Sequence, residues 1–378
     1  MKLRACSSAL VTAALSLALT GVASPAGAAD PPPFLDRLHT VSFVASTIPE
    51  NHDVNPYGTF TIRESIGDLH WGNVLVSNFN NSAGLQGLGT TLVQITPDGT
   101  RTTFATIDPT NLPGKCPGGV GLTTALTVLP GGWVVVGSLP TTDGSPATTD
   151  AGCLLVLDKH GTVRETIASK EINGPWDMTA VSTEKRGGES GRTELFVTNV
   201  LNGTVAGGGA EVDGGTVLRI TLCTEGDQPP QVVATKVIGS GFPERTDPTA
   251  LVVGPTGVGL GHDGTLFVAD TVLSRITAIP DALTRNDDAG IGRVITSGGS
   301  LNGPLGMAIT PKGDILTVNG NDGNIVETTE RGRQVATKQI NNEGNPAGAG
   351  NLFGLALDLD HDAVYFVNNF ENSLDVLH

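Results

Sequence analysis

Two aspartates stand where a carboxylate pair can form, and this pair is the chain's best candidate for acid-base or metal chemistry. Asp177 follows the run Gly174-Pro-Trp, and Asp247 precedes Pro248 in the next copy of the same pattern. Each proline marks the start of a strand, because proline has no N–H to donate. Carboxylates from adjacent copies can share a cation or exchange a proton with a substrate. The alternative is that Asp177 binds backbone amides between the copies.

Aromatic residues form a second candidate site. Tyr57, Trp176 and Phe353 occupy matching positions near the start of a strand, and Asn55 and Asn351 lie beside two of these positions. Aromatic rings at the mouth of a channel can stack on a sugar, a peptide or an aromatic ligand. The same rings can instead fill the channel as core. The sequence leaves both interpretations open.

Other catalytic chemistries find little support in the sequence. There is no Cys-x-x-Cys or His-x-x-x-His spacing, so a zinc site is not indicated. There is also no Gly-x-Ser-x-Gly elbow for a nucleophilic serine. His52 alone precedes the first copy near the expected mouth, and the histidines of the turns are expected to be structural.

A repeated unit of two strands and a turn positions all of these residues. The clearest copy is Asn302–Asn319, in which an apolar run, a Pro311-Lys-Gly turn and a second strand follow one another. In the fourth copy the first strand is expected at Asp247–Val253. The second strands of the six copies end at Asn78, Ser138, Asn199, Asp270, Asn319 and Asn368. A constant register with variable insertions is typical of a repeat array, and these short polar residues are expected to cap the following turn.

Two strands without local partners indicate a closed ring. The strand at His39–Ile48 has no partner nearby, and the last copy, which stops at His378, is one strand short of four. Pairing the two removes both exposed sheet edges. The sequence therefore predicts an all-β fold, a six-bladed β-propeller of four-stranded blades that is closed by the N-terminal strand pairing in the last blade.

Long loops are expected to gather on one face of this ring. Because the first and third strands of a blade run parallel, Phe79–Gly89, Leu139–Gly152 and Val200–Gly214 all lie around the channel mouth. Loops on a rigid scaffold are common places for binding sites. Cys116 and Cys153 fall on the same face within one blade, so we predict a disulfide between them, with one free thiol elsewhere.

The chain is expected to be exported. Residues 1–29 are predicted to be a signal peptide, because Lys2 and Arg4 precede an apolar stretch and a small-residue cleavage site. A Pro-rich segment, 30–39, leads into the propeller, 40–378. We therefore expect a secreted or periplasmic monomer. A formal net charge of -16 disfavours nucleic acid and anionic membranes, and no other apolar run is long enough to span a bilayer.

The layout resembles the NHL-repeat propellers and, more broadly, the senescence-marker and gluconolactonase-like six-bladed propellers. The motifs that carry the resemblance are Gly303–Ala308, Asp263–Asp270 and Ser274-Arg-Ile. The resemblance implies that the gluconolactonase-like enzymes hold a divalent metal at the channel mouth with Asn, Asp and Glu. Hard cations need several oxygen ligands, and this chain offers too few at the matching positions. The residues of this chain at those matching positions are Tyr57, Thr124, Trp176, Thr249, Leu305 and Phe353.

Three functions from different classes remain. The sequence best fits a scaffold that binds a small molecule or peptide at the channel mouth through the aromatic and amide residues, with no cofactor expected. The first alternative is a metal-dependent hydrolase, lactonase or lyase that uses Asp177 and Asp247 around a divalent cation such as calcium. The second is a structural or interaction module with a filled channel.

Overall fold

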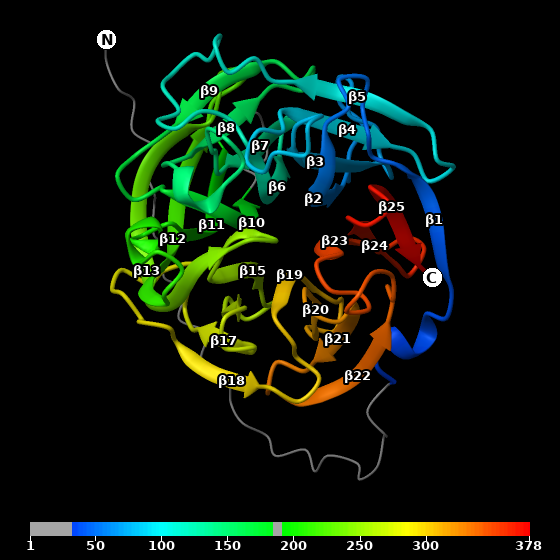
Figure 1. Ribbon diagram of the computed structural model, residues 1–378. Coiled ribbons are helices and arrows are strands. Elements are labelled where there is room, and N and C mark those ends of the chain that lie inside the picture. Colours follow the sequence, from blue (N-terminus) through cyan, green and yellow to red (C-terminus); the bar gives the residue numbers. More distant parts are fainter. Residues whose placement is uncertain (1–31, 184–190) are drawn as a thin grey trace, which may run out of the picture.

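Six short antiparallel sheets are arranged around a central axis in the computed structural model, which describes residues 32–183 and 191–378 (Figure 1). The sheets are the blades of a propeller, and blades 1 to 6 are numbered in chain order of their innermost strands. The predicted fold class and blade number are confirmed. The predicted signal peptide, residues 1–29, lies outside the described residues.

The innermost strands surround the channel, and each is largely buried. They are β2 (Val54–Thr61), β6 (Leu122–Leu129), β10 (Gly174–Thr183), β15 (Pro255–Leu260), β19 (Pro304–Ile309) and β23 (Leu352–Asp358). The second strands are β3 (Val74–Asn80), β7 (Trp133–Ser138), β11 (Gly191–Val200), β16 (Leu266–Asp270), β20 (Ile315–Asn319) and β24 (Ala363–Asn368).

The third strands follow the long loops, and the fourth strands form the rim in Figure 1. The third strands are β4 (Thr91–Ile95), β8 (Cys153–Leu157), β12 (Val212–Thr224), β17 (Arg275–Ile279), β21 (Asn324–Thr328) and β25 (Ser373–Leu377). The rim strands are β5 (Arg101–Thr106), β9 (Val163–Ile167), β13 (Gln231–Asp247), β18 (Arg293–Ser297), β22 (Gln334–Gln339) and β1 (Val41–Ser46). Among the described residues the helices are η1 (Leu35–Arg37), η2 (Pro146–Thr148) and α1 (Thr204–Gly207), and none could cross a membrane.

The ring closes as predicted. β1 pairs antiparallel with β25, from Val41 opposite Leu377 to Ser46 opposite Ser373. The Pro-rich segment is part of the packed structure and not only a connection to the propeller, because Phe34 and Leu35 are fully buried. Their backbone N–H groups donate to the carboxylate of Glu327 in blade 5, at 2.7 and 2.8 Å. The N-terminal segment therefore fastens blade 6 to blade 5 as well as completing blade 6.

The predicted capping of the following turn is confirmed for Asn368 and Asp270. Asn78 and Asn199 instead bond to backbone groups elsewhere. Asn78 Nδ2 donates to Thr47 O at 3.0 Å, Gly174 N donates to Asn199 Oδ1 at 3.0 Å, and Phe370 N donates to Asn368 Oδ1 at 3.1 Å. Each amide thus joins the end of a second strand to a backbone group. This repeated duty explains the residue type at these positions without any ligand.

One predicted strand is wrong. Asp247–Val253 does not form the innermost strand of blade 4, because β15 takes that place and pairs with β16. Instead β13 runs on to Asp247 and turns back into β14 (Leu251–Val253), a fifth strand of blade 3. Thr256, not Thr249, therefore occupies the matching position in blade 4. The run Gly254-Pro-Thr-Gly257 repeats Gly303-Pro-Leu-Gly306 more closely and would have identified the correct strand.

The innermost strands approach one another most closely at a ring of small residues. A Cβ added to Gly257, Gly306 or Gly354 would lie 2.1 to 2.2 Å from a carbonyl oxygen of the next innermost strand. Only glycine allows such an approach of two backbones. We call this level the waist. It separates the loop end of the channel, where the innermost strands begin, from the open end, where they finish.

Candidate functional site

The loop end of the channel is filled by protein. The three predicted long loops are present there, and the hairpin of β13 and β14 lies among them. Gln86 Nε2 in the first loop donates to Pro248 O at the hairpin turn, at 2.8 Å. The residues of β14 belong to the same buried cluster as the aromatic residues below them. The predicted mouth is therefore roofed by the hairpin.

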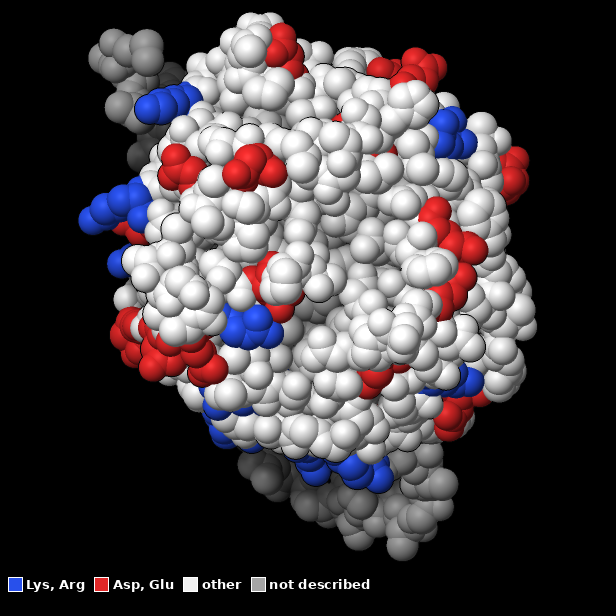
Figure 2. Space-filling model, viewed as in Figure 1, with Lys and Arg blue, Asp and Glu red and all other residues white. Residues whose placement is uncertain are grey.

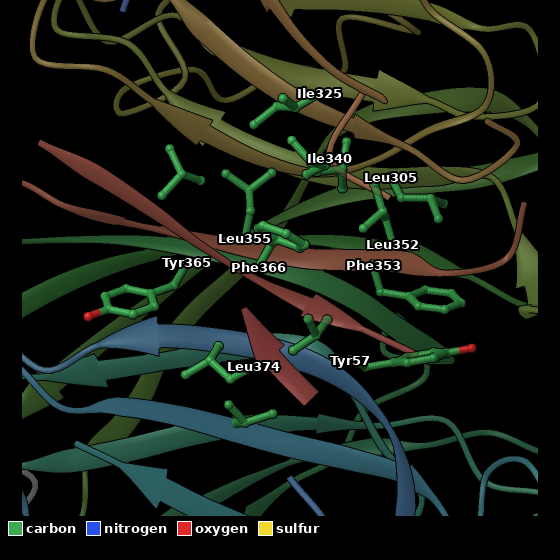
Figure 3. Packing of buried hydrophobic residues seen from close by; sticks show 14 of the residues in the cluster. Tyr57, Leu305, Ile325, Ile340, Leu352, Phe353, Leu355, Tyr365, Phe366 and Leu374 are labelled. Atoms are coloured by element: carbon green, nitrogen blue, oxygen red, sulfur yellow. The ribbon is translucent and has the colours of Figure 1, made fainter. Parts of the chain in front are cut away.

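The three predicted ligand-binding rings lie in the core beneath this roof. Tyr57 stacks on Phe353 with ring centroids 4.0 Å apart (Figure 3). It also stacks on Phe79, with ring centroids 4.4 Å apart. The ring centroid of Trp176 lies 6.4 Å from that of Tyr57, and Trp176 Nε1 donates a hydrogen bond to Val252 O of the hairpin at 3.1 Å. Tyr57, Trp176 and Phe353 are each no more than 2% exposed. The rings thus adopt the second of the two sequence interpretations, a filled channel.

The two predicted amides are buried beside these rings and bind other amides. Asn55 Nδ2 donates to Asn80 Oδ1 at 3.0 Å, and Asn351 Nδ2 donates to Asn341 Oδ1 at 2.7 Å. His52, in contrast, is exposed in the connection before β2. The Oδ1 of Asn55 and the hydroxyl of Tyr57 are buried without a hydrogen-bond partner among the described residues. The loop end therefore also holds unsatisfied polar groups, but they are enclosed in the core.

Asp247 has a structural task in the hairpin. Its carboxylate accepts hydrogen bonds from Thr249 N and Ala250 N and forms an ion pair with Arg245 at 2.9 Å. These bonds hold the tight turn between β13 and β14. Asp247 does not line the space that contains Asp177. The structure therefore does not bring together the carboxylate pair expected from the sequence.

The predicted disulfide is present in blade 2. Cys116 and Cys153 are bonded across a sequence separation of 37 residues, with Cα atoms 5.3 Å apart. Cys116 precedes β6 and Cys153 begins β8, so the bond ties the start of the innermost strand to the third strand. The expected free thiol is wrong, because no cysteine of the described residues is free.

Replacing Cys116 and Cys153 by serine should lower the free energy of unfolding by about 3–4 kcal/mol, because the bond restricts the unfolded chain. Urea denaturation of the wild-type and double-variant proteins, each with and without a reductant, measures this effect. The reductant should destabilise the wild-type protein far more than the double variant. Equal destabilisation of both would show that this bond contributes nothing.

A cavity of about 390 Å³ occupies the open end of the channel. All six innermost strands line it beyond the waist, with Thr59, Leu126, Met178, Val258, Met307 and Leu355 as one residue from each. About half of the lining residues are aliphatic, but the accessible surface of the wall is more polar than apolar. This space was not predicted, because the sequence patterns that indicated a site cover only the part of each innermost strand from its start to the waist. Tracing the alternate residues onward through Thr59 and Thr61 would have shown polar side chains continuing along the channel.

Asp177 is the one carboxylic acid among the lining residues of this cavity. It occupies the waist position that is glycine in blades 1, 4, 5 and 6 and alanine, Ala125, in blade 2, so only blade 3 places a polar side chain there. Its Oδ1 accepts a hydrogen bond from Met178 N at 2.8 Å, and Val258 N of blade 4 also donates to the carboxyl group. Burial outweighs these bonds and raises the pKa of Asp177 to about 8. The group is therefore mainly protonated at neutral pH.

Three hydroxyl groups of the lining residues lack hydrogen-bond partners among the described residues. The Oγ1 atoms of Thr59, Thr61 and Thr124 are buried and bind no other described atom. All three residues line the cavity. A buried hydroxyl without a partner is unfavourable. These three oxygens have almost no accessible surface, so the carboxyl group of Asp177 is the buried polar group of the lining on which the site is built.

Comparisons with known proteins identify the fold but no close relative. No family model and no curated protein matches this sequence. A calcium-binding regucalcin from Agrobacterium tumefaciens is 13% identical, with a TM-score of 0.52 over 89% of this chain and 93% of that one. A gluconolactonase from Xanthomonas campestris is 13% identical, with a TM-score of 0.50 over 86% of each chain. The chain shares their six-bladed propeller fold.

A PQQ-bound aldose sugar dehydrogenase from Streptomyces coelicolor is similar to the same extent. It is 14% identical, with a TM-score of 0.50 over 89% of this chain and 98% of that one. The expected resemblance in architecture is confirmed by these structures. At such identities the likeness extends to the fold and not to the activity.

The residues at the loop end do not fit a divalent metal. The matching positions hold buried rings, aliphatic chains and threonines, and the apolar hairpin covers them. In residues 32–183 and 191–378 no three His, Cys, Asp or Glu side chains are placed so that they could hold an ion. Among the described residues, the loop end offers no set of ligands for a divalent metal.

Proposed function

We propose that this protein is a binding module that takes up a small molecule in the open end of its channel. The observation that carries the proposal is the cavity of about 390 Å³, whose mixed polar and apolar wall contains the buried carboxyl group of Asp177. Typical ligand sites are concave, mainly apolar and of about 300–1,000 Å³, with a few converging polar groups. We place the hydrogen-bonding end of the ligand at Asp177.

The proposal moves the site from the mouth expected at the loop end to the opposite end of the channel. At the loop end the rings are closed in by the hairpin, and their contacts are those of a core. We further propose that the protein is exported, since the disulfide in blade 2 suits an oxidising compartment and the predicted signal peptide gives the route.

An enzyme is the second candidate, and the pKa of Asp177 favours it. A buried carboxylic acid with a pKa of about 8 can donate or accept a proton near neutral pH. Under this alternative Asp177 acts alone as the general acid or base, because Asp247 lies outside the cavity. A product that forms with the wild-type protein and not with Asp177→Asn would establish catalysis.

A fragment screen by thermal shift tests the proposed site. Compounds that bind in the cavity raise the melting temperature of the wild-type protein, because ligands stabilise the state that binds them. The Ala180→Phe variant fills the cavity from β10, so these shifts should disappear. The control is Ala234→Phe, which adds the same ring at a similarly half-buried position on the rim strand β13. Shifts that persist in Ala180→Phe would refute the site.

A further inference from the structure

Two ionisable residues line the cavity, and they lie at its two ends. Asp177 is at the waist, whereas Arg63 follows β2 at the rim of the open end. Gly58 marks the waist on β2, so Arg63 is five residues further along. At about 3.3 Å per residue this separation is roughly 16 Å along the strand direction. A ligand that spans the cavity therefore meets different chemistry at each end.

The guanidinium of Arg63 is available for a ligand. Arg63 is exposed, and none of the ion pairs between described residues includes it. Arginine binds a carboxylate through two parallel hydrogen bonds, a geometry that lysine does not offer. An anionic group at the rim would gain this contact without breaking an existing one.

The charge balance inside the cavity favours an anion although the protein as a whole is acidic. Acidic side chains are spread over the face in Figure 2, in keeping with the formal net charge of -16. The cavity lining contains the cationic Arg63, and the remaining lining groups are neutral when Asp177 is protonated. A cleft with one sign of charge and a low-dielectric wall concentrates ligands of the opposite sign.

We propose that the ligand is a small aliphatic organic acid whose carboxylate pairs with Arg63, while a hydroxyl or carbonyl group at its other end binds Asp177. This inference rests on the proposed function and adds the ligand class to it. The body of the ligand lies along Val128, Leu260 and Ile309, the half-buried apolar residues of the lining between the two polar ends. A cationic ligand would face Arg63 with like charge, and a neutral one would leave it unused.

Three probes of equal length test the ligand class. They are ω-hydroxyhexanoate, hexamethylene glycol and ω-aminohexanol, which share one hydroxyl end and differ in the charge of the other. Titration calorimetry on the full-length protein at neutral pH compares their affinities. The acid should bind at least about tenfold more tightly than the glycol, as expected for a charge-assisted pair. The amine should bind more weakly than the glycol.

Variants of two exposed arginines separate the specific contact from net charge. Arg63→Gln should abolish the preference for the acid over the glycol, whereas Arg293→Gln, on the rim strand β18, should preserve it. Equal binding of acid and glycol by the wild-type protein, or a preference for the amine, would overturn the organic-acid class. If that binding is still lost in Ala180→Phe, the proposed function stands. Failure of all three probes to bind at millimolar concentration would overturn both.

Discussion

The Asp177→Asn variant should be more stable than the wild-type protein above pH 8, with an advantage that shrinks as the pH falls toward 4. The folded-state pKa of Asp177 is raised from 3.8 to about 8 by burial. The unfolded chain therefore loses this proton at a lower pH than the folded protein does. Stability is fully present below the unfolded pKa and declines as the pH rises through the folded pKa.

The change in stability with pH is large because the pKa of Asp177 in the folded protein lies far above its pKa in the unfolded chain. Each pH unit between the two pKa values corresponds to about 1.4 kcal/mol, so the wild-type protein should lose several kcal/mol across this pH range. Asparagine has nearly the same shape and does not ionise, so its variant should not show this loss. Urea denaturation at a series of pH values gives the free energies of unfolding.

A surface aspartate provides the matched control. Asp227 is exposed in the connection between β12 and β13, so Asp227→Asn should follow the wild-type pH dependence. Parallel curves for Asp177→Asn and the wild-type protein would show that the carboxyl group is not held protonated by burial. In that case its role as a neutral hydrogen-bonding group in the cavity would be lost as well.

Glu244 should account for part of the pH dependence that remains in Asp177→Asn. This glutamate on β13 is fully buried, and its Oε1 accepts a hydrogen bond from Asn202 N at 2.6 Å. Burial raises its pKa to about 7. The pKa shift of Glu244 has the same direction as that of Asp177, so the stability of the folded protein falls as the pH rises. The pH range of this fall is narrower, because the shift is smaller.

The blade number and the closure of the ring were predictable because both follow from local patterns. Each copy carries its own apolar strands and turn residues, and the unpaired strands at the two ends have one obvious solution. The hairpin of β13 and β14 was not predictable in the same way. Its residues Asp247-Pro-Thr resemble the start of an innermost strand, and only the pairing of Pro255 with Asp270 across the sheet decides between the two registers.

The candidate site could be predicted only in part. Asp177 was identifiable, because it replaces a glycine that recurs in four other blades. Which end of the channel is filled depends on contacts between residues far apart in sequence, such as Trp176 with Val252. Aromatic residues near the start of an innermost strand fit a ligand platform and a core equally well. Burial by a distant hairpin is what distinguishes the two.

Trp176→Ala should lower the free energy of unfolding by about 3–5 kcal/mol, the usual cost of removing a large ring from a packed core. Trp176 is 2% exposed, packs beside Tyr57 and donates a hydrogen bond to the hairpin. The change therefore opens a cavity at the loop end and releases the roof above it. Urea denaturation at constant pH measures the loss.

Two further tryptophan variants show which contacts of Trp176 cause this loss of stability. Trp176→Phe keeps most of the ring and removes the bond to Val252 O, so it should cost much less than alanine. Trp71→Ala removes the same ring from a position that is 54% exposed, and its cost should stay below about 1 kcal/mol. If Trp176→Ala proved as mild as Trp71→Ala, the rings at the loop end would not be core. The expectation that Tyr57, Trp176 and Phe353 bind a ligand there would then replace the site at Asp177.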